Sequence, residues 1–196
     1  DIINEIYDNG TFIVASAGNG STCGGASNLV YPASFDNVFS VTSVGSSDNH
    51  EKNIGDPNST HQHNATVDLC APGYDVPISA APAWHLFGTG TSYAAPFVTG
   101  TVGLMLSVNP CLSNWEIEQI LKQSSDDIYA LNQGYVGLLG AGRLNAEHAV
   151  SLAANGVSNT QPCGQPIVEC DQNQSVWAGL CQTTFWGYTD VYAKAD

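Results

Sequence analysis

The segment Gly90-Thr91-Ser92-Tyr93-Ala94-Ala95-Pro96 places one serine among small residues at the start of a long apolar run. The run continues from Phe97 to Val108 and predicts a helix that begins close to Ser92. Pro96 fits a helix only in the first turn, where its missing N–H costs nothing. Free N–H groups at a helix N-terminus stabilise negative charge, including the charge that forms when a serine hydroxyl attacks a carbonyl. The segment therefore predicts either a nucleophilic serine or one that only caps a buried helix.

A second segment, Phe12–Gly20, has the composition of a buried strand that ends at an asparagine between two glycines. Short apolar runs bounded by turn residues are typical of parallel strands that are covered on both faces. The side-chain amide of Asn19, at the end of this strand, could donate a hydrogen bond to a developing oxyanion. Taken alone, Asn19 also fits an ordinary turn, because Asn-Gly is a common turn pair.

Together the two segments resemble the motifs of the subtilisin-like serine proteases, the subtilases. Residues 90–96 are similar to the family's nucleophile motif, and Ala17-Gly18-Asn19 is similar to its oxyanion-hole motif. Further stretches resemble family blocks in the same order along the chain, namely Tyr31-Pro32-Ala33 and residues 37–45, 67–73 and 140–145. The resemblance implies an α/β fold with a mostly parallel sheet flanked by helices, and a serine endopeptidase that acts on protein or peptide substrates.

The resemblance also implies roles for individual residues. Ser92 takes the place of the catalytic nucleophile, and Asn19 that of the catalytic oxyanion donor. The residues that would bind substrate beside them are all small and uncharged: Ala15, Ser16, Ala17, Gly18, Gly90 and Thr91. Of these, Ala15, Ser16 and Ala17 would line the pocket for the P1 side chain, and their small size hints at a roomy, neutral pocket for large apolar P1 residues. No cofactor is required for this chemistry, and without an Asp-rich loop in the sequence calcium binding is left open.

The aspartate and histidine motifs that precede the serine in subtilases do not occur in this sequence. None of the five histidines is followed by glycine, as the family's histidine motif requires. The chain therefore resembles the C-terminal half of a catalytic domain, at residues 1–155. We expect the N-terminal half, within the same polypeptide or as a separate chain, to be the partner that supplies both residues. The chain alone is predicted to be inactive and not to form a stable monomer.

The alternative function is that of a non-catalytic pseudoprotease or binding module that only presents a surface to a partner. Both Ser92 and Asn19 are retained in the sequence. Their retention favours the endopeptidase, because drift in a pseudoprotease would be expected to alter one of them.

Composition narrows the class of protein. The formal net charge is −14, from 18 acidic and 4 basic residues. So negative a chain is not expected to bind nucleic acid or an anionic membrane, since both select Lys and Arg. The uncharged stretch from Gly88 to Trp115 is long enough for a membrane helix, but Asn109-Pro110 interrupts it and no basic flank follows. We expect a central helix buried around its whole circumference instead.

Six cysteines, at positions 23, 70, 111, 163, 170 and 181, have no zinc-type spacing. An even number scattered through the chain predicts disulfide bonds and a secreted or extracellular protein. The last three lie in residues 156–196, which we interpret as a linker and a short Cys- and aromatic-rich tail. That tail could be a small disulfide-stapled unit or part of a further domain, and its aromatic residues are more typical of a minimal core than of a binding face.

The predicted order of elements is a helix ending at Gly10, three strands, the helix after Gly90 and two further helices. The first of these two spans 112–122, with Ser113 or Asn114 as its cap and an apolar stripe of Trp115, Ile117, Ile120 and Leu121. The second runs from Asn145 to about Ala154.

The loop from Ser46 to Asn64 departs most from the family pattern. His61 and His63 could bind a metal ion together with Asp56, but no third ligand has diagnostic spacing. We therefore expect a solvated polar loop and no metal site.

Overall fold

The computed structural model describes residues 2–81, 84–155, 175–177, 180–185 and 188–192. These residues fall into two compact units, Asp1–Gly156 and Val157–Asp196. Each unit is described by itself.

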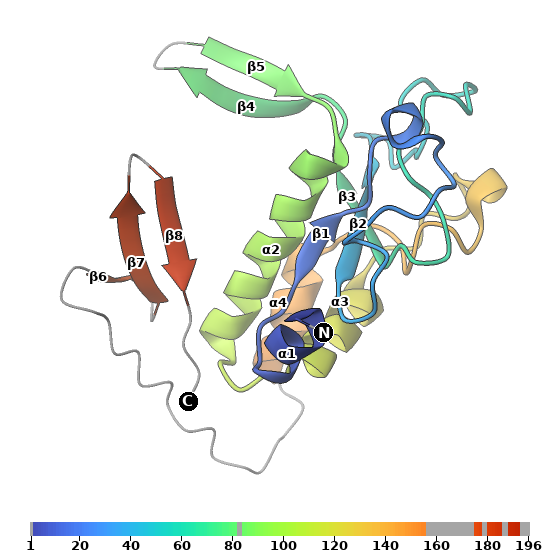
Figure 1. Cartoon of the computed structure of the whole chain (residues 1–196). Helices are drawn as coiled ribbons and strands as arrows, with labels where there is room; N and C mark the ends of the chain where they lie inside the picture. The colour runs from blue at the N-terminus through green and yellow to red at the C-terminus, as the bar shows by residue number, and fades with distance from the viewer. Residues whose placement is uncertain (1, 82–83, 156–174, 178–179, 186–187, 193–196) are drawn as a thin grey trace. The chain divides into compact units, whose positions relative to one another are not determined.

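A parallel sheet forms the centre of the first unit (Figure 1). Its strands are β1 (Val14–Ser16), β2 (Phe39–Val44) and β3 (Leu69–Pro72), in the spatial order β1-β2-β3. Every residue of β2 is buried, as expected for a strand that has a neighbour on each side and is covered on both faces. The predicted α/β fold with a parallel sheet is confirmed.

The two edges of this sheet differ. Beyond β3, Cys70 N donates to Gly142 O at 2.8 Å and Leu144 N donates to Cys70 O at 2.7 Å, so a further segment continues the parallel pairing. At the other edge β1 pairs with β2, and no other strand among the described residues pairs with it. All three residues of β1 are only half-buried. The expectation that this strand is fully buried is wrong for this chain, because its outer edge has no neighbour within the described part.

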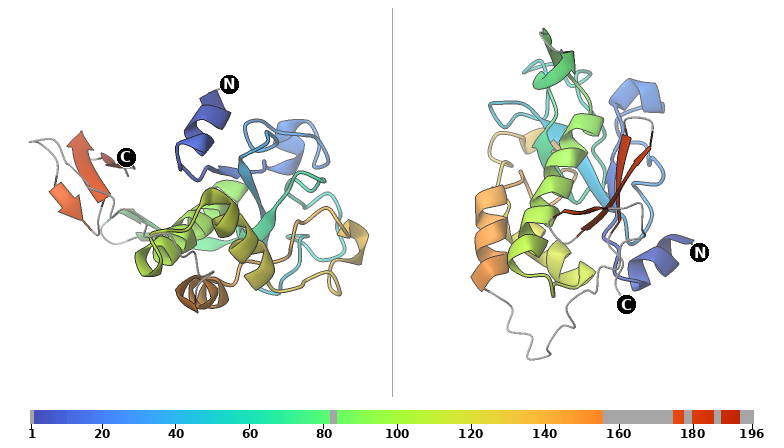
Figure 2. Two further views of the ribbon diagram at one scale, coloured as in Figure 1. Left: turned by 90° about the horizontal axis from the view of Figure 1, so that it is seen from below. Right: turned by 90° about the vertical axis from the view of Figure 1, so that its left-hand side faces the viewer.

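Within the described part of this unit, four α-helices accompany the sheet: α1 (Ile2–Asp8), α2 (Thr91–Val108), α3 (Asn114–Ser124) and α4 (Ala146–Asn155). The long helix α2 packs against all three strands, and α4 packs against α2 and α3 (Figures 1 and 2). Short 3₁₀ turns lie at Gly20–Cys23 and Gln133–Tyr135. The main core contains Val41, Leu69, Val98, Met105 and Leu121.

The caps of the helices agree with the sequence. Gly10 follows α1 with a φ of 84°, which glycine adopts more readily than other residues. Ser113 caps α3 through a capping box, in which its hydroxyl accepts from Glu116 N and its own N–H donates to the Glu116 carboxylate at 2.8 Å. In the apolar stripe of α3, however, Trp115 is 62% exposed and does not belong to the core.

Two expectations for α2 are wrong. Pro96 is the sixth residue of the helix and lies inside it, beyond the first turn. The helix is also not buried around its circumference, since Phe97, Leu104 and Val108 are 44%, 55% and 47% exposed. The sheet and α4 cover one side of α2, and nothing in the described part of this unit covers these three side chains.

A β-hairpin that we did not predict leads into α2. It consists of β4 (Val76–Ala81) and β5 (Trp84–Gly88), which pair antiparallel and project beyond the sheet (Figure 1). Among the described residues, no helix is long and apolar enough to cross a membrane.

In the second unit, β6 (Ser175–Trp177), β7 (Leu180–Phe185) and β8 (Tyr188–Tyr192) form an antiparallel sheet. Cys163 and Cys170 lie outside the described residues, so the disulfide-stapled tail stays a prediction.

The disulfide prediction is wrong for two cysteines of the first unit. Cys23 and Cys70 are free thiols. Cys70 is fully buried in β3, where its Sγ donates to Leu139 O at 3.3 Å. Burial raises the pKa of the Cys70 thiol, so that little of the reactive thiolate forms. Burial also shields the sulfur from an oxidant or a second cysteine.

Candidate active site

Ser92 lies at the N-terminal end of α2, as the sequence predicts. It is the second residue of the helix and is exposed, so its hydroxyl is accessible. Gly90 N donates to Gly73 O at 2.8 Å, which ties the start of the helix to the chain that follows β3. The N–H of a residue in the first helical turn has no intrahelical acceptor, so the Ser92 amide is available to a ligand.

Asn19 follows β1 and contacts the same helix N-terminus. Its Oδ1 accepts two hydrogen bonds from Thr91, one from the backbone N at 2.8 Å and one from Oγ1 at 3.0 Å. The Thr91 hydroxyl in turn accepts from Gly18 N at 3.1 Å. Because Thr91 engages the carboxamide oxygen, the Nδ2 group of Asn19 is left as a donor, and within the described residues it makes no hydrogen bond. No pattern in the sequence indicates that Thr91 orients Asn19.

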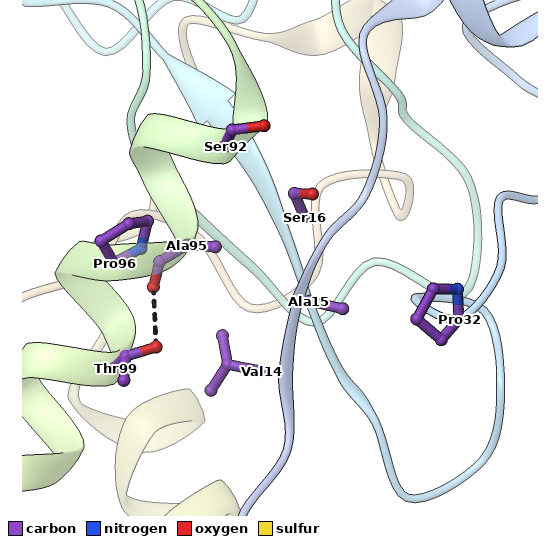
Figure 3. A pocket seen from close by; sticks show the side chains of 8 residues that line it. All are labelled: Val14, Ala15, Ser16, Pro32, Ser92, Ala95, Pro96 and Thr99. Atoms are coloured by element: carbon purple, nitrogen blue, oxygen red, sulfur yellow. Dashed lines mark hydrogen bonds between the residues drawn. The ribbon is translucent and has the colours of Figure 1, made fainter. Parts of the chain in front are cut away.

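A pocket of about 560 Å³ opens between β1 and α2 (Figure 3). Ser92 lies at one end of it, at the start of the helix, and Ser16 faces the same space from β1. No charged side chain lines it, and most of the lining is apolar. The lining residues are Val14, Ala15, Ser16, Pro32, Ser92, Ala95, Pro96 and Thr99.

The residues predicted to bind substrate fall into two groups. Ala15 and Ser16 line the pocket together with Ser92. The other four are buried around Asn19 and do not line it: Ala17, Gly18, Gly90 and Thr91. A contact of any of them with substrate stays a prediction.

Gln62 completes this region, and no sequence pattern pointed to it. Its backbone N donates to Gly18 O at 3.1 Å, and its side-chain Oε1 accepts from Gly20 N at 2.7 Å. One residue of the loop between β2 and β3 therefore binds both neighbours of Asn19.

The histidines of the same loop contact one another and do not line the pocket with Ser92. His50 Nδ1 lies 3.0 Å from Ser43 O, and His50 Nε2 lies 3.1 Å from His63 Nδ1. Burial lowers the pKa of His50 and of His61 to about 4, so both are neutral at pH 7. Within the described residues, neither ring makes a hydrogen bond to Ser92, and neither lines the pocket beside it.

The metal site considered for Asp56, His61 and His63 receives no support. Within the described residues, no group of three His, Cys, Asp or Glu side chains is arranged to hold a metal ion. The polar loop is nevertheless less solvated than expected, because His50, His61 and Gln62 are buried.

The model of the subtilase family of peptidases matches residues 1–165 of the chain. The chain belongs to the subtilase family. It is 31% identical over 147 residues to Subtilisin BL of Lederbergia lenta, covering 75% of this chain and 49% of that protein. It is also 31% identical over 147 residues to the alkaline protease of Alkalihalobacillus alcalophilus, and the match covers 34% of that protein. The chain thus spans about half the length, or less, of these relatives.

Solved subtilase structures share the fold. The self-cleaved protease domain of PatA matches with a TM-score of 0.59 and 25% identity, covering 79% of this chain and 54% of that one. A structure of the subtilase cytotoxin SubAB assembly matches with a TM-score of 0.61 and 26% identity, again covering 79% and 54%. These findings establish the serine-protease family and the fold, and they cover only part of each relative.

Proposed function

We propose that this chain supplies the nucleophile and the oxyanion hole of a serine endopeptidase, with Ser92 and Asn19 in these roles. The observation that carries the proposal is the pair of hydrogen bonds from Thr91 to Asn19 Oδ1, at 2.8 and 3.0 Å. These bonds hold the Asn19 amide beside the residue that precedes Ser92 and leave Nδ2 as a donor. The buried Thr91 fixes the orientation of the Asn19 carboxamide. An asparagine in an ordinary turn needs no such partner.

The chemistry follows from this arrangement. Ser92 Oγ attacks the carbonyl carbon of the scissile peptide bond and passes its proton to a histidine outside the chain. The carbonyl oxygen becomes an oxyanion, which accepts hydrogen bonds from Asn19 Nδ2 and from the Ser92 backbone N–H. Collapse of this intermediate expels the amine, which takes up the proton, and leaves an acyl group on Ser92 for water to remove. None of these steps requires a cofactor, and calcium binding stays open.

We infer that the partner is an N-terminal half of the catalytic domain, which carries the aspartate and the histidine. Three features support this partner: the unpaired outer edge of β1, the exposed apolar side chains of α2 and the pocket between them. Unpaired edges and apolar patches are surfaces at which another segment packs. Ser92 lies at this surface, so a histidine on the incoming half would reach its hydroxyl.

The substrate is proposed to be a protein or peptide with a large apolar P1 residue, because the pocket beside Ser92 is neutral and mostly apolar. The acidic charge of the chain supports neither a nucleic acid nor an anionic membrane as partner. Secretion is proposed from the low content of charged residues, 11%, and from the remaining cysteines.

A second candidate is a non-catalytic pseudoprotease. The observation that favours it is that no described histidine side chain lines the pocket with Ser92. The two candidates differ in what precedes the chain: intact Asp and His motifs favour the endopeptidase, and their loss favours the pseudoprotease.

The test combines the chain with a segment that carries the Asp and His motifs and measures peptide hydrolysis. Ser92→Ala is expected to abolish turnover, and Asn19→Ala to lower kcat by about 10²–10³, the effect that loss of the corresponding donor has in subtilisin itself. Ser107→Ala, an exposed serine on the same helix, is the matched control and is expected to leave kcat unchanged. Full turnover by the Ser92→Ala protein would refute the proposal.

A further inference from the structure

The backbone on both sides of Asn19 is held by one residue from a distant part of the chain. Gly18 O accepts from Gln62 N at 3.1 Å, and Gly20 N donates to Gln62 Oε1 at 2.7 Å. Thr91 fixes the side chain of Asn19, as described above. The direction of the Asn19 amide therefore depends on Gln62 for the backbone and on Thr91 for the carboxamide oxygen.

Gln62 is itself firmly placed. Its side chain is fully buried, and its Nε2 group donates to Gly25 O at 2.7 Å. Its carbonyl accepts from the hydroxyl of Thr42, a residue of the central strand β2. The side-chain amide thus joins Gly20 to Gly25 across the 3₁₀ turn that follows Asn19, while its backbone is tied to the sheet.

The residues next to Gln62 are equally well fixed. His61 N donates to Tyr74 Oη at 3.1 Å, and the Tyr74 hydroxyl donates to His50 O at 2.8 Å. His63 N donates to Ala26 O at 2.8 Å. Because the residues on both sides of Gln62 are held by these hydrogen bonds, its backbone has little freedom to shift.

The packing around Gly18 gives independent support. Gly18 has a φ of 120°, and a Cβ added there would lie 3.0 Å from Gln62 Oε1 and 3.0 Å from Val30 Cγ2. Gly18 and the Gln62 side chain are therefore in close contact. A shift of the Gln62 side chain is expected to move the backbone at Gly18.

We propose that Gln62 is a positioning residue for the oxyanion donor Asn19, an inference that rests on the proposed function of Asn19. Gln62 does not touch the reacting atoms. It acts by holding Gly18 and Gly20 so that Asn19 Nδ2 meets the oxyanion in the transition state. Interactions realised only in the transition state affect kcat and leave KM nearly unchanged.

The experiment is a double-mutant cycle with Gln62→Met and Asn19→Ala, in the chain combined with the Asp- and His-bearing segment. Gln62→Met keeps the volume of the side chain and removes its polar contacts. We expect kcat to fall by about 10- to 100-fold with KM changed less than about twofold, because a shift of 1 Å at a catalytic group can cost about 10²-fold. In the Asn19→Ala background, Gln62→Met is expected to lower kcat by less than about twofold, because the group it positions is gone.

Asn114→Leu is the matched control. Asn114 is also a buried amide, and its Nδ2 donates to Tyr7 O at 2.8 Å and Thr11 O at 3.1 Å, at the other end of β1 from Asn19. It is expected to lower the melting temperature and leave kcat unchanged. If Gln62→Met does not fold, Gln62→Asn, which retains an amide with a shorter reach, is measured in the same cycle.

The outcomes separate the two proposals. Equal losses of kcat from the Gln62 variant with and without Asn19 would overturn the positioning role and leave the function of Asn19 intact. An unchanged kcat in the Gln62 variant, beside a large loss in Asn19→Ala, would do the same. An unchanged kcat in Asn19→Ala would overturn the oxyanion role and, with it, the positioning role.

Discussion

The two edges of the central sheet are finished in different ways. At the β3 edge, residues 142–144 continue the parallel pairing, and Arg143 is bound by Asp48 and Asp126. At the β1 edge the strand has one neighbour among the described residues, and the pocket with Ser92 opens beside it. The chain thus closes the β3 edge of the sheet itself and leaves open the β1 edge, beside which the pocket with Ser92 lies.

We infer from this difference that stability depends mainly on the closed edge and function on the open edge. The closed edge is stabilised by contacts within the chain, so substitutions there act on folding. The open edge exposes backbone groups and apolar side chains that a stable monomer normally covers. Under the proposed function, the missing catalytic residues and the missing cover of this edge come from the same N-terminal half.

The largest expected effect is on the chain without that half. We expect no peptide hydrolysis that depends on Ser92, because the serine hydroxyl is a poor nucleophile without a base. We also expect aggregation or self-association in size-exclusion chromatography, in place of a monomer with a cooperative melt. The same measurements after addition of the N-terminal half are the control. A soluble, cooperatively melting monomer would contradict the interpretation of the open edge.

At the closed edge, Gly142→Ala is expected to destabilise the protein by roughly 3 kcal/mol or more. Gly142 has a φ of 128°, and a Cβ there would lie 2.2 Å from Asp126 O. That carbonyl is fixed, since it accepts from Arg143 N at 2.9 Å. Urea unfolding of the assembled protein measures the loss.

Gly137→Ala separates backbone strain from this steric clash. Gly137 also has a positive φ, 77°, but nothing lies within 4 Å of an added Cβ. We expect it to cost about 1 kcal/mol, the strain of the left-handed conformation alone. Equal effects of the two substitutions would contradict the packing described for the closed edge.

The buried histidines of the loop between β2 and β3 predict that the free energy of unfolding depends on pH. Burial lowers the pKa of His50 to about 4, whereas an unfolded histidine titrates near 6.5. The unfolded state therefore binds more protons between these values. The contribution of His50 to the free energy of unfolding is fully present above about pH 6.5 and is lost as the pH drops towards 4, by on the order of 3 kcal/mol. His61, whose pKa is lowered in the same direction, steepens the fall.

Urea unfolding at pH 7 and pH 5 checks this dependence. His50→Gln is expected to reduce the difference between the two values, because the buried ring that must be protonated is absent. A parent protein equally stable at both pH values would contradict the neutral, buried state of His50.

The sequence predicted the parts of the site that are local in the chain. The serine at a helix start and the asparagine at a strand end are patterns of a few residues, and both lie where these patterns indicate. Gln62 could not be predicted, because it contacts Gly18 and Gly20 from more than 40 positions away, and no periodicity marks such a contact. The β4–β5 hairpin was not predicted, and its strands project beyond the sheet (Figure 1).

The errors at β1 and α2 have a different origin. Their apolar patterns predicted full burial, yet β1 is half-buried and Leu104 on α2 is 55% exposed. A pattern reports how apolar a surface is, and it does not tell which chain covers that surface. The same mismatch between pattern and burial supports the proposal that a further half packs here.

The exposed face of α2 allows a direct test of that cover. Leu104→Ser is expected to leave the far-UV circular dichroism spectrum of the chain unchanged, because the side chain is already largely exposed. Its affinity for the N-terminal half is expected to fall by roughly 1–2 kcal/mol, or about 5- to 30-fold in Kd, since binding would bury the leucine. Leu131→Ser is the matched control, because Leu131 is 59% exposed but lies outside α2 and β1. Titration calorimetry with the N-terminal half compares the two variants, and equal affinities would place the interface elsewhere than on the exposed face of α2.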